Sequence, residues 1–245
     1  MRGSAQGGGR GDGARAPTGG KSASRAYIEL NQQITRLGSA GELCELIEAR
    51  SAEFNHVNVS TAFRKLLSAG RAGVHPTARS TALHKLEKCA MSTMADSNSQ
   101  GVANILHIVA KTRHRPSNHE FLATLDARVE EVARECNSQG VANTLWAYAT
   151  MGRRPGERVL GALDARVEAV ARECNSQDVA NTLWAYATMG RRPGERVLGA
   201  LEARVEEVAR ECNSQEVANT LWAYATMGRR PGERVLEVQI GRAHV

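Results

Sequence analysis

The sequence lacks the cysteine and histidine patterns of metal centres and the long apolar runs of membrane proteins. No CxxC pair or Cys/His cluster with zinc spacing occurs, and no run approaches the roughly 18 apolar residues of a membrane span. Cys136, Cys174 and Cys212 recur at one position at the end of a predicted amphipathic helix, where a small buried hydrophobe fits. We therefore expect reduced thiols, an intracellular protein, and no metal, cofactor or membrane partner.

The sequence also lacks an arrangement of residues typical of an active site. No pairing of a nucleophile with a base recurs along the chain. The seven histidines fit no metal spacing: they are His56, His75, His84, His107, His114, His119 and His244. We predict a protein that is not an enzyme and has no catalytic residue.

Aromatic residues are few, at 4% of the chain, and the positive charge is unevenly distributed. The net charge of the chain is +6. Residues 1–25, with five basic side chains and one acidic side chain, contribute +4 of it. The remaining 220 residues carry 27 basic and 25 acidic side chains. A basic surface on the main part of the chain therefore needs local segregation of charge.

What the chain does contain is a repeat, NSQDVANTLWAYATMG at residues 175–190. Near copies begin at Asn137 and Asn213, and a weaker copy begins at Asn98. The glutamines of the three strong copies are 38 residues apart, a period typical of helical solenoids, in which each unit buries its apolar face against its neighbours. The sequence predicts an all-α fold, an α-solenoid of tandem helix-turn-helix repeats of about 38 residues.

The predicted array occupies residues 26–236, where apolar residues recur at helical spacing. Residues 1–25 are rich in glycine, basic, and have little to bury, so we expect them to be disordered. The register breaks near the end, and we interpret residues 237–245 as a non-native read-through tail after a truncated repeat. The five predicted helix pairs span residues 39–70, 76–112, 116–152, 155–190 and 193–228.

Caps define the predicted helix ends. Asn175 suits an N-cap and Gly190 a helix C-terminus, and the other strong copies repeat both residues. Prolines at 116, 155, 193 and 231 are predicted to start first helices, at the position where a missing N–H costs nothing.

Two polar or aromatic positions recur inside the second helices. We predict that Asn104, Asn143, Asn181 and Asn219 form a hydrogen-bonded ladder between units rather than contact bases. Tryptophans at 146, 184 and 222 lie beside leucines, which favours the core over a role as stacking platforms for bases.

The run Q-x-V-A-N-T-L-W-A-Y-A-T-M-G, with its 38-residue period, closely resembles the octotricopeptide repeat. The match is strong at 139–152, 177–190 and 215–228, and partial at 100–112. First helices depart from the family, because they begin with PGERVL where members usually show a tryptophan-containing, proline-rich run. The resemblance implies single-stranded RNA as the partner and control of the stability, processing or translation of organelle transcripts. Relatives can end in a nuclease-like RAP domain, which is not visible in this sequence.

Paired cations between units are the first candidates for RNA contacts. Regularly spaced arginines would suit a phosphate backbone, although arginines after a helix end also complement its dipole. The candidates are Arg113, Arg115, Arg153, Arg154, Arg191, Arg192, Arg229 and Arg230.

Positions that differ between near-identical units are the candidate base readers. One follows the glutamine (Gly140, Asp178, Glu216), where an acid could instead complete a capping box. The other lies on the first helix (Asp164, Glu202).

We expect an RNA-binding helical-repeat protein, located in the chloroplast or mitochondrion. A protein-binding scaffold without RNA contact is the alternative, since stacked helix pairs serve both roles.

Overall fold

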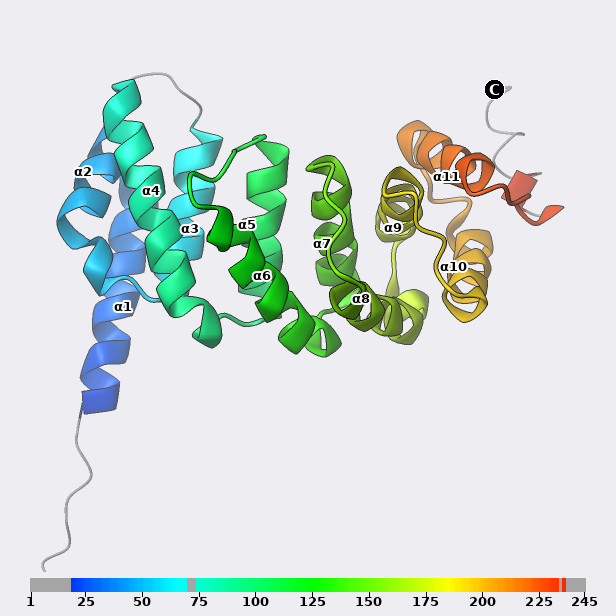
Figure 1. Ribbon diagram of the computed structural model, residues 1–245, viewed down its shortest axis with the longest axis horizontal. Helices are drawn as coiled ribbons and strands as arrows, with labels where there is room; N and C mark the ends of the chain where they lie inside the picture. Colours follow the sequence, from blue (N-terminus) through cyan, green and yellow to red (C-terminus); the bar gives the residue numbers. More distant parts are fainter. Residues whose placement is uncertain (1–18, 70–73, 234, 237–245) are drawn as a thin grey trace, which may run out of the picture.

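The chain folds into a row of helices packed side by side. The computed structural model describes residues 19–69, 74–233 and 235–236, and within these ranges it contains helices and turns but no strand (Figure 1). Each helix packs against its neighbours in the row, so the predicted all-α solenoid is confirmed. The apolar side chains form one continuous core from α1 to the end of the array.

One helix precedes five helix pairs. The first helix, α1 (Gly19–Arg36), begins inside the segment predicted to be disordered, so that prediction is wrong for residues 19–25. Residues 1–18 of that segment and the predicted read-through tail at 237–245 lie outside the described residues. The pairs are α2 (Ala40–Arg50) with α3 (His56–Ser68), α4 (Pro76–Thr93) with α5 (Ser99–Lys111), α6 (His119–Val132) with α7 (Ser138–Thr150), α8 (Glu157–Val170) with α9 (Ser176–Thr188), and α10 (Glu195–Val208) with α11 (Ser214–Thr226).

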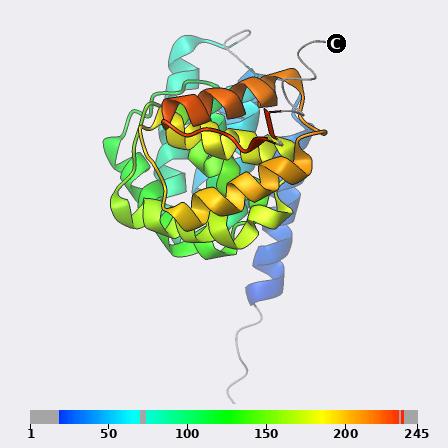
Figure 2. The ribbon, with the colours of Figure 1, turned by 90° about the vertical axis from the view of Figure 1, so that its right-hand side faces the viewer.

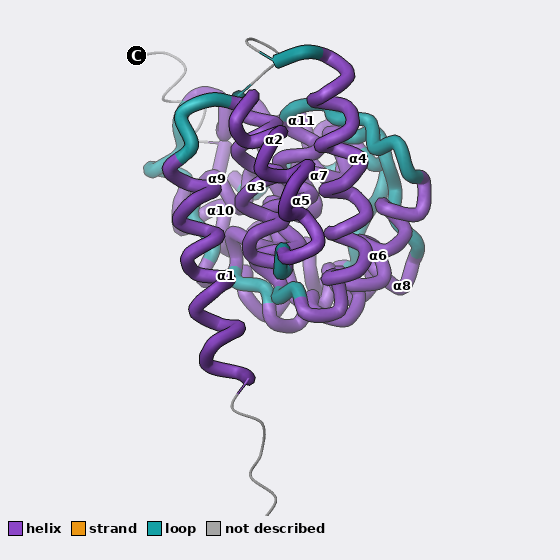
Figure 3. Tube along the Cα trace, turned by 90° about the vertical axis from the view of Figure 1, so that its left-hand side faces the viewer, coloured by secondary structure: helices purple, strands orange, loops and turns teal. Residues whose placement is uncertain are grey.

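The pairs form two layers. The second helices α3, α5, α7, α9 and α11 pack closely on one another, and the first helices make fewer contacts within their own layer. Views along the row from its two ends show the helices of successive units lying behind one another (Figures 2 and 3). The second helices α5, α7 and α9 are therefore covered by the second helices on both sides and by the first helix of the next unit, which leaves one narrow face for solvent.

Asparagine caps begin the second helices. The Asn98, Asn137 and Asn175 side chains accept hydrogen bonds from the backbone N–H three residues later, at 2.9, 2.7 and 2.8 Å. A cap of this kind stabilises a helix by about 1 kcal/mol over alanine. The predicted N-caps are confirmed.

Each second helix of the regular units ends at a glycine in the left-handed region. Gly152, Gly190 and Gly228 have φ of 64°, 62° and 66°. At Gly190, the glycine N–H bonds to the Ala187 carbonyl and the next N–H to the Tyr186 carbonyl. This pair of bonds is the Schellman motif.

The equivalent residue after α5 is Arg113, the single non-glycine residue with positive φ in the described part of the chain, at 52°. A left-handed conformation costs a residue with Cβ about 1 kcal/mol. We expect Arg113→Gly to raise the free energy of unfolding by somewhat less than that amount. The reduction arises because glycine has more conformational entropy in the unfolded chain, which stabilises the unfolded state. Urea unfolding of both proteins measures the difference, and a less stable glycine variant would contradict the prediction. Gly152→Arg is the reverse control and should destabilise.

The prolines do not occupy the predicted first helical positions. The first helices α8 and α10 begin two residues after Pro155 and Pro193, with Gly156 and Gly194 as N-caps, and α6 begins after the Asn118 cap. Pro155 and Pro193 are buried at the joints between units. The rigid ring therefore directs the chain from one unit to the next, and the glycine after it caps the helix. Pro76 is the proline that does stand at the start of a helix.

Arginines of the first helices join consecutive units. Arg128 donates to the Ser97 carbonyl of the preceding unit at 2.8 Å, and Arg204 donates to the Cys174 carbonyl at 2.6 Å. Arg166 makes the same bond to Cys136. Exposed ion pairs, Arg158 with Glu130 and Arg196 with Glu168, join the same layer.

Candidate functional site

The first arginine of each turn pair closes its own unit. Arg153 binds Asp126, Arg191 binds Asp164 at 2.5 Å, and Arg229 binds Glu202 at 3.1 Å. In each pair the carboxylate lies on the first helix, and the arginine follows the second helix of the same unit. These three guanidinium groups therefore face protein carboxylates, and their predicted contact with phosphate stays a prediction.

A tyrosine shares the carboxylate of this ion pair. The buried hydroxyls of Tyr148 and Tyr186 donate to Asp126 and Asp164, each at 2.8 Å. Burial, followed by the nearby carboxylate, holds the pKa of both phenols well above the ordinary value. Both phenols therefore remain proton donors. The Tyr224 hydroxyl has no partner, because Glu202 replaces the aspartate in that unit.

Glu87 occupies the same position on α4, with a histidine in place of the arginine. Its carboxylate is buried, bonds to His114 Nε2 at 2.9 Å, and accepts from the Ser117 hydroxyl at 2.6 Å. The Ser117 and Asn118 backbone N–H groups also donate to it. Burial would raise the pKa of Glu87, but these hydrogen bonds outweigh burial and lower it.

A carboxyl group with a lowered folded-state pKa stabilises the protein above its unfolded pKa, and this contribution is lost as pH falls through the folded pKa. We expect the difference in free energy of unfolding between the wild type and Glu87→Gln to be constant near neutral pH. It should shrink as pH falls from about 5 to about 3. Urea titrations of both proteins at several pH values measure it. A difference that grows on acidification would show that burial dominates instead.

The second arginine of each turn pair lies at the surface. Arg154 and Arg192 make exposed ion pairs with Glu157 and Glu195, three residues later. Such pairs contribute little and exchange readily with other anions. Arg115 and Arg230 are exposed, as is Arg113. These cations follow the C-terminal ends of the second helices.

The structure gives most of the candidate base readers roles within the protein. Asp178 and Glu216 are 5% and 9% exposed and complete capping boxes with Asn175 and Asn213. Gly140 donates its backbone N–H to the Asn137 cap. Asp164 and Glu202 belong to the closing ion pairs. Base contact by these residues stays a prediction, while the geometry favours the caps and ion pairs.

A different set of side chains occupies the solvent face of the second helices. They are spaced i, i+4, i+7 and i+11 from the glutamine, so they lie along one face of each helix. We call this set the amide–aromatic stripe. Its members are Gln100, Asn104, His107 and Lys111 on α5, Gln139, Asn143, Trp146 and Thr150 on α7, Gln177, Asn181, Trp184 and Thr188 on α9, and Gln215, Asn219, Trp222 and Thr226 on α11.

The predicted asparagine ladder is wrong. Asn104 is exposed, and the asparagines at 143, 181 and 219 are half-exposed. Among the described residues no hydrogen bond joins these asparagines across units, and Asn219 accepts one from Gln215 of its own helix at 2.9 Å. The amides therefore have donor and acceptor capacity to spare.

The tryptophans are core residues only in part. Trp146 and Trp184 are half-buried and pack against the core, whereas Trp222 is 46% exposed. The ring of Trp146 lies 4.9 Å from that of His107 on the neighbouring helix, between centroids. The stripes of α5 and α7 are thus in contact, and the groove between them is lined by the amides of Gln100, Asn104, Gln139 and Asn143, with Glu135 at its N-terminal end.

Charge is segregated between the two layers. In the sequences of the five second helices the only acidic residues are Asp178 and Glu216, and both are buried as caps. The first helices carry exposed carboxylates, such as Glu157 and Glu195. The solvent-facing side chains of the second helices themselves include no exposed carboxylate, and exposed cations follow their C-terminal ends. Exposed glutamates lie at the opposite ends, in the turns that precede α7, α9 and α11: Glu135, Glu173 and Glu211.

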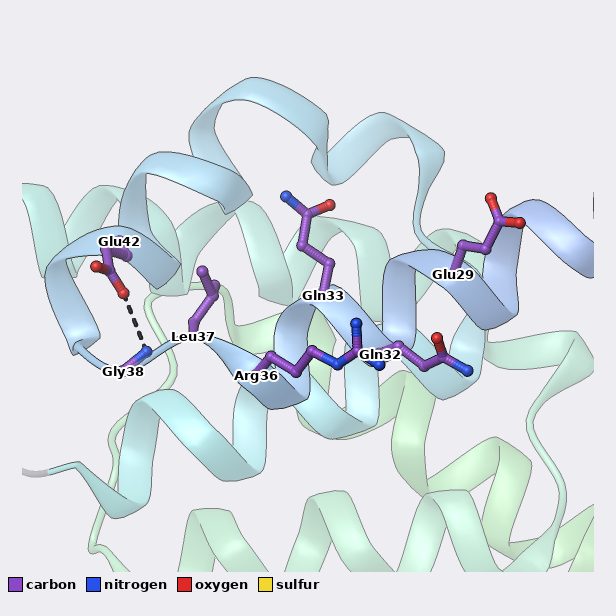
Figure 4. Close-up of a pocket in the computed structure, with 7 residues that line it drawn as sticks. All are labelled: Glu29, Gln32, Gln33, Arg36, Leu37, Gly38 and Glu42. Atoms are coloured by element: carbon purple, nitrogen blue, oxygen red, sulfur yellow. Dashed lines mark hydrogen bonds between the residues drawn. The ribbon is translucent and has the colours of Figure 1, made fainter.

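Two features away from the stripe, a hollow near the N-terminus and a buried thiol, involve groups with structural roles. Figure 4 shows a hollow between α1 and α2, where Glu42 accepts hydrogen bonds from the Gly38 and Ser39 backbone N–H groups at the start of α2.

Burial raises the pKa of Cys174 to about 12, so this thiol stays neutral. Within the described ranges no group of three or more His, Cys, Asp or Glu side chains is placed to hold a metal ion. None of the described helices is long and apolar enough to cross a membrane.

Comparison with known proteins relates the C-terminal part of the chain to a translation factor. Residues 153–244 match the family model of the Tbc2 translation factor, N-terminal domain. Residues 97–106 and 133–145 match a family of proteins of unknown function, DUF1601. No curated protein matches the chain. Over residues 153–244 the chain is thus similar to a helical domain of a translation factor.

Proposed function

We propose that this protein binds single-stranded RNA on the solvent face of its second-helix layer. The observation that carries the proposal is the amide–aromatic stripe, whose own side chains include no carboxylate and whose C-terminal end is followed by exposed arginines. Amides offer a donor and an acceptor to base edges, and tryptophan offers a platform on which a base stacks. A polyanion would meet no carboxylate along the stripes and cations at their C-terminal ends, whereas the first helices and the turns before the second helices present acids.

The exposed turn cations supply the phosphate contacts in this proposal. Arg115, Arg154, Arg192 and Arg230 lie one per unit, just beyond the C-terminal end of each stripe. A strand that crosses the stripes would pass these cations at regular intervals. The first arginines of the pairs act indirectly, by closing each unit.

The similarity to a translation factor and the likeness to octotricopeptide repeats support a role in gene expression. We propose that the protein controls the stability, processing or translation of organelle transcripts. Residues 1–25 are basic, poor in acids and contain serines, as transit peptides do, but their sequence shows no amphipathic stretch. The proposed chloroplast or mitochondrial location therefore rests on the likeness to octotricopeptide repeats.

Binding to RNA should depend steeply on salt. If these four cations, one per unit, contact phosphates, the slope of log affinity against log salt is expected near −3, from about −0.7 per phosphate on a single strand. Fluorescence anisotropy with a labelled random-sequence RNA of about ten nucleotides, repeated at several NaCl concentrations, measures it. Changing Arg154 and Arg192 to glutamine should make the slope shallower by about 1.4.

A protein-binding scaffold predicts the opposite behaviour. Its partner would contact the exposed apolar side chains, such as Trp222, and its affinity would change little with salt. Absence of RNA retention at low salt would refute the proposed function. The control is Arg158→Gln on the first-helix layer, which removes one charge away from the stripe and should leave the slope unchanged.

A further inference from the structure

The geometry points to a preference for three consecutive bases of one kind, adenines, read by the stripes of α7, α9 and α11. This inference rests on the proposed RNA binding and specifies its target.

The three stripes are identical. Each presents glutamine, asparagine, tryptophan and threonine at the same four positions of its helix. Within these helices the three units differ only at residues 140, 178 and 216, and those residues are glycine or a buried cap. The turns that follow, up to the start of the next first helix, are also identical. Three equal surfaces cannot select three different bases, so a target read here contains the same base at successive positions.

The chemistry of the stripe favours adenine. A side-chain amide pairs with the N6 donor and N7 acceptor of adenine in a bidentate arrangement. The guanine edge carries two acceptors and calls for arginine or lysine, which these three stripes lack. Cytosine offers a donor that suits aspartate or glutamate, and these three stripes contain neither. Uracil also offers a donor and an acceptor to an amide, so hydrogen bonds alone do not separate it from adenine. Tryptophan adds a stacking platform that a purine covers more fully than a pyrimidine, which favours adenine over uracil.

The stripe of α5 marks where the run of identical stripes ends. It keeps Gln100 and Asn104 but has His107 and Lys111 in place of the tryptophan and threonine. Burial and Lys111 lower the pKa of His107, so its ring also stacks as a neutral platform. A fourth base, bound at α5, would therefore meet the same two amides with the Lys111 cation beside them. We assign the repeated preference for one base to α7, α9 and α11 only.

The test uses labelled RNAs with three adenines in a cytidine context, and variants with each adenine replaced in turn. Replacing the middle adenine should weaken binding to the wild type by roughly tenfold. Asn181→Ala should remove most of this penalty, because α9 is the middle helix of the three and meets the middle base in either strand direction. Asn143→Ala should relax discrimination at one outer base and leave the middle penalty intact.

A matched control places the same amide in the other layer. Ala165→Asn, on the exposed face of α8, should change neither affinity nor discrimination. Equal, salt-sensitive binding of all sequences would overturn this inference and leave the proposed RNA binding intact. A preference for a run of another base would overturn the assignment of adenine. Absence of binding to every RNA would overturn both proposals, and urea unfolding verifies that each variant is folded.

Discussion

Replacing Asp164 with alanine is expected to lower the free energy of unfolding by about 3 kcal/mol, because it removes the centre of a buried polar network. One oxygen of Asp164 accepts from the Tyr186 hydroxyl, and the other accepts from Arg191. The phenol is fully buried and would lose its only acceptor. The guanidinium would remain largely buried, with only an exposed pair to Glu157. Urea unfolding followed by circular dichroism measures the loss.

The fifth unit allows a test in the opposite direction, because it carries Glu202 at the repeat position of Asp164. Glu202 is one methylene longer than Asp164, and the Tyr224 hydroxyl is left without a partner. Glu202→Asp should restore the bond to Tyr224 and stabilise the protein by about 1 kcal/mol. A tolerated Asp164→Ala, with a loss below about 0.5 kcal/mol, would show that the network contributes no more than an exposed pair.

Replacing Trp184 with alanine is expected to weaken RNA binding by about tenfold or more, because base stacking on an aromatic side chain contributes about 1–3 kcal/mol. Trp184 is half-buried, so alanine also removes packing from the core. Anisotropy titrations measure affinity, and urea unfolding reports the loss of stability separately.

Trp184→His is the matched variant, since a histidine occupies this position on α5 and packs against Trp146. It keeps a ring on the stripe and should retain most of the affinity that alanine loses. Equal affinity of the wild type and the alanine variant would contradict the placement of RNA on this face.

The helix pairs could be predicted because their ends are set by local rules. An asparagine cap and a glycine at positive φ act within a few residues of the helix end, so both can be recognised in the sequence. The sequence predicts Pro155 and Pro193 at the first helical position, but they lie two residues before it. The glycine after Pro155 is equally able to cap, and the buried proline ring packs between units.

The solvent face of the second helices could not be predicted in the same way. A helix that is apolar on several sides leaves one narrow face exposed, and the orientation of that face depends on how far each unit is rotated on the previous one. The recurrence of asparagine at positions 143, 181 and 219 is compatible both with a buried ladder and with an exposed row. The bond between Arg191 and Asp164 spans 27 residues and depends on where the two helices of a unit meet.

The unequal packing of the two layers has a mechanical consequence. Second helices are joined by apolar side chains in close contact, whereas first helices are joined mainly by arginine hydrogen bonds and exposed ion pairs. Exposed ion pairs resist separation weakly. Bending therefore opens or closes the first-helix edge while the distances between neighbouring stripes stay nearly constant. The array behaves as a strip with one stiff edge and one compliant edge, and the spacing of its contacts survives changes in curvature.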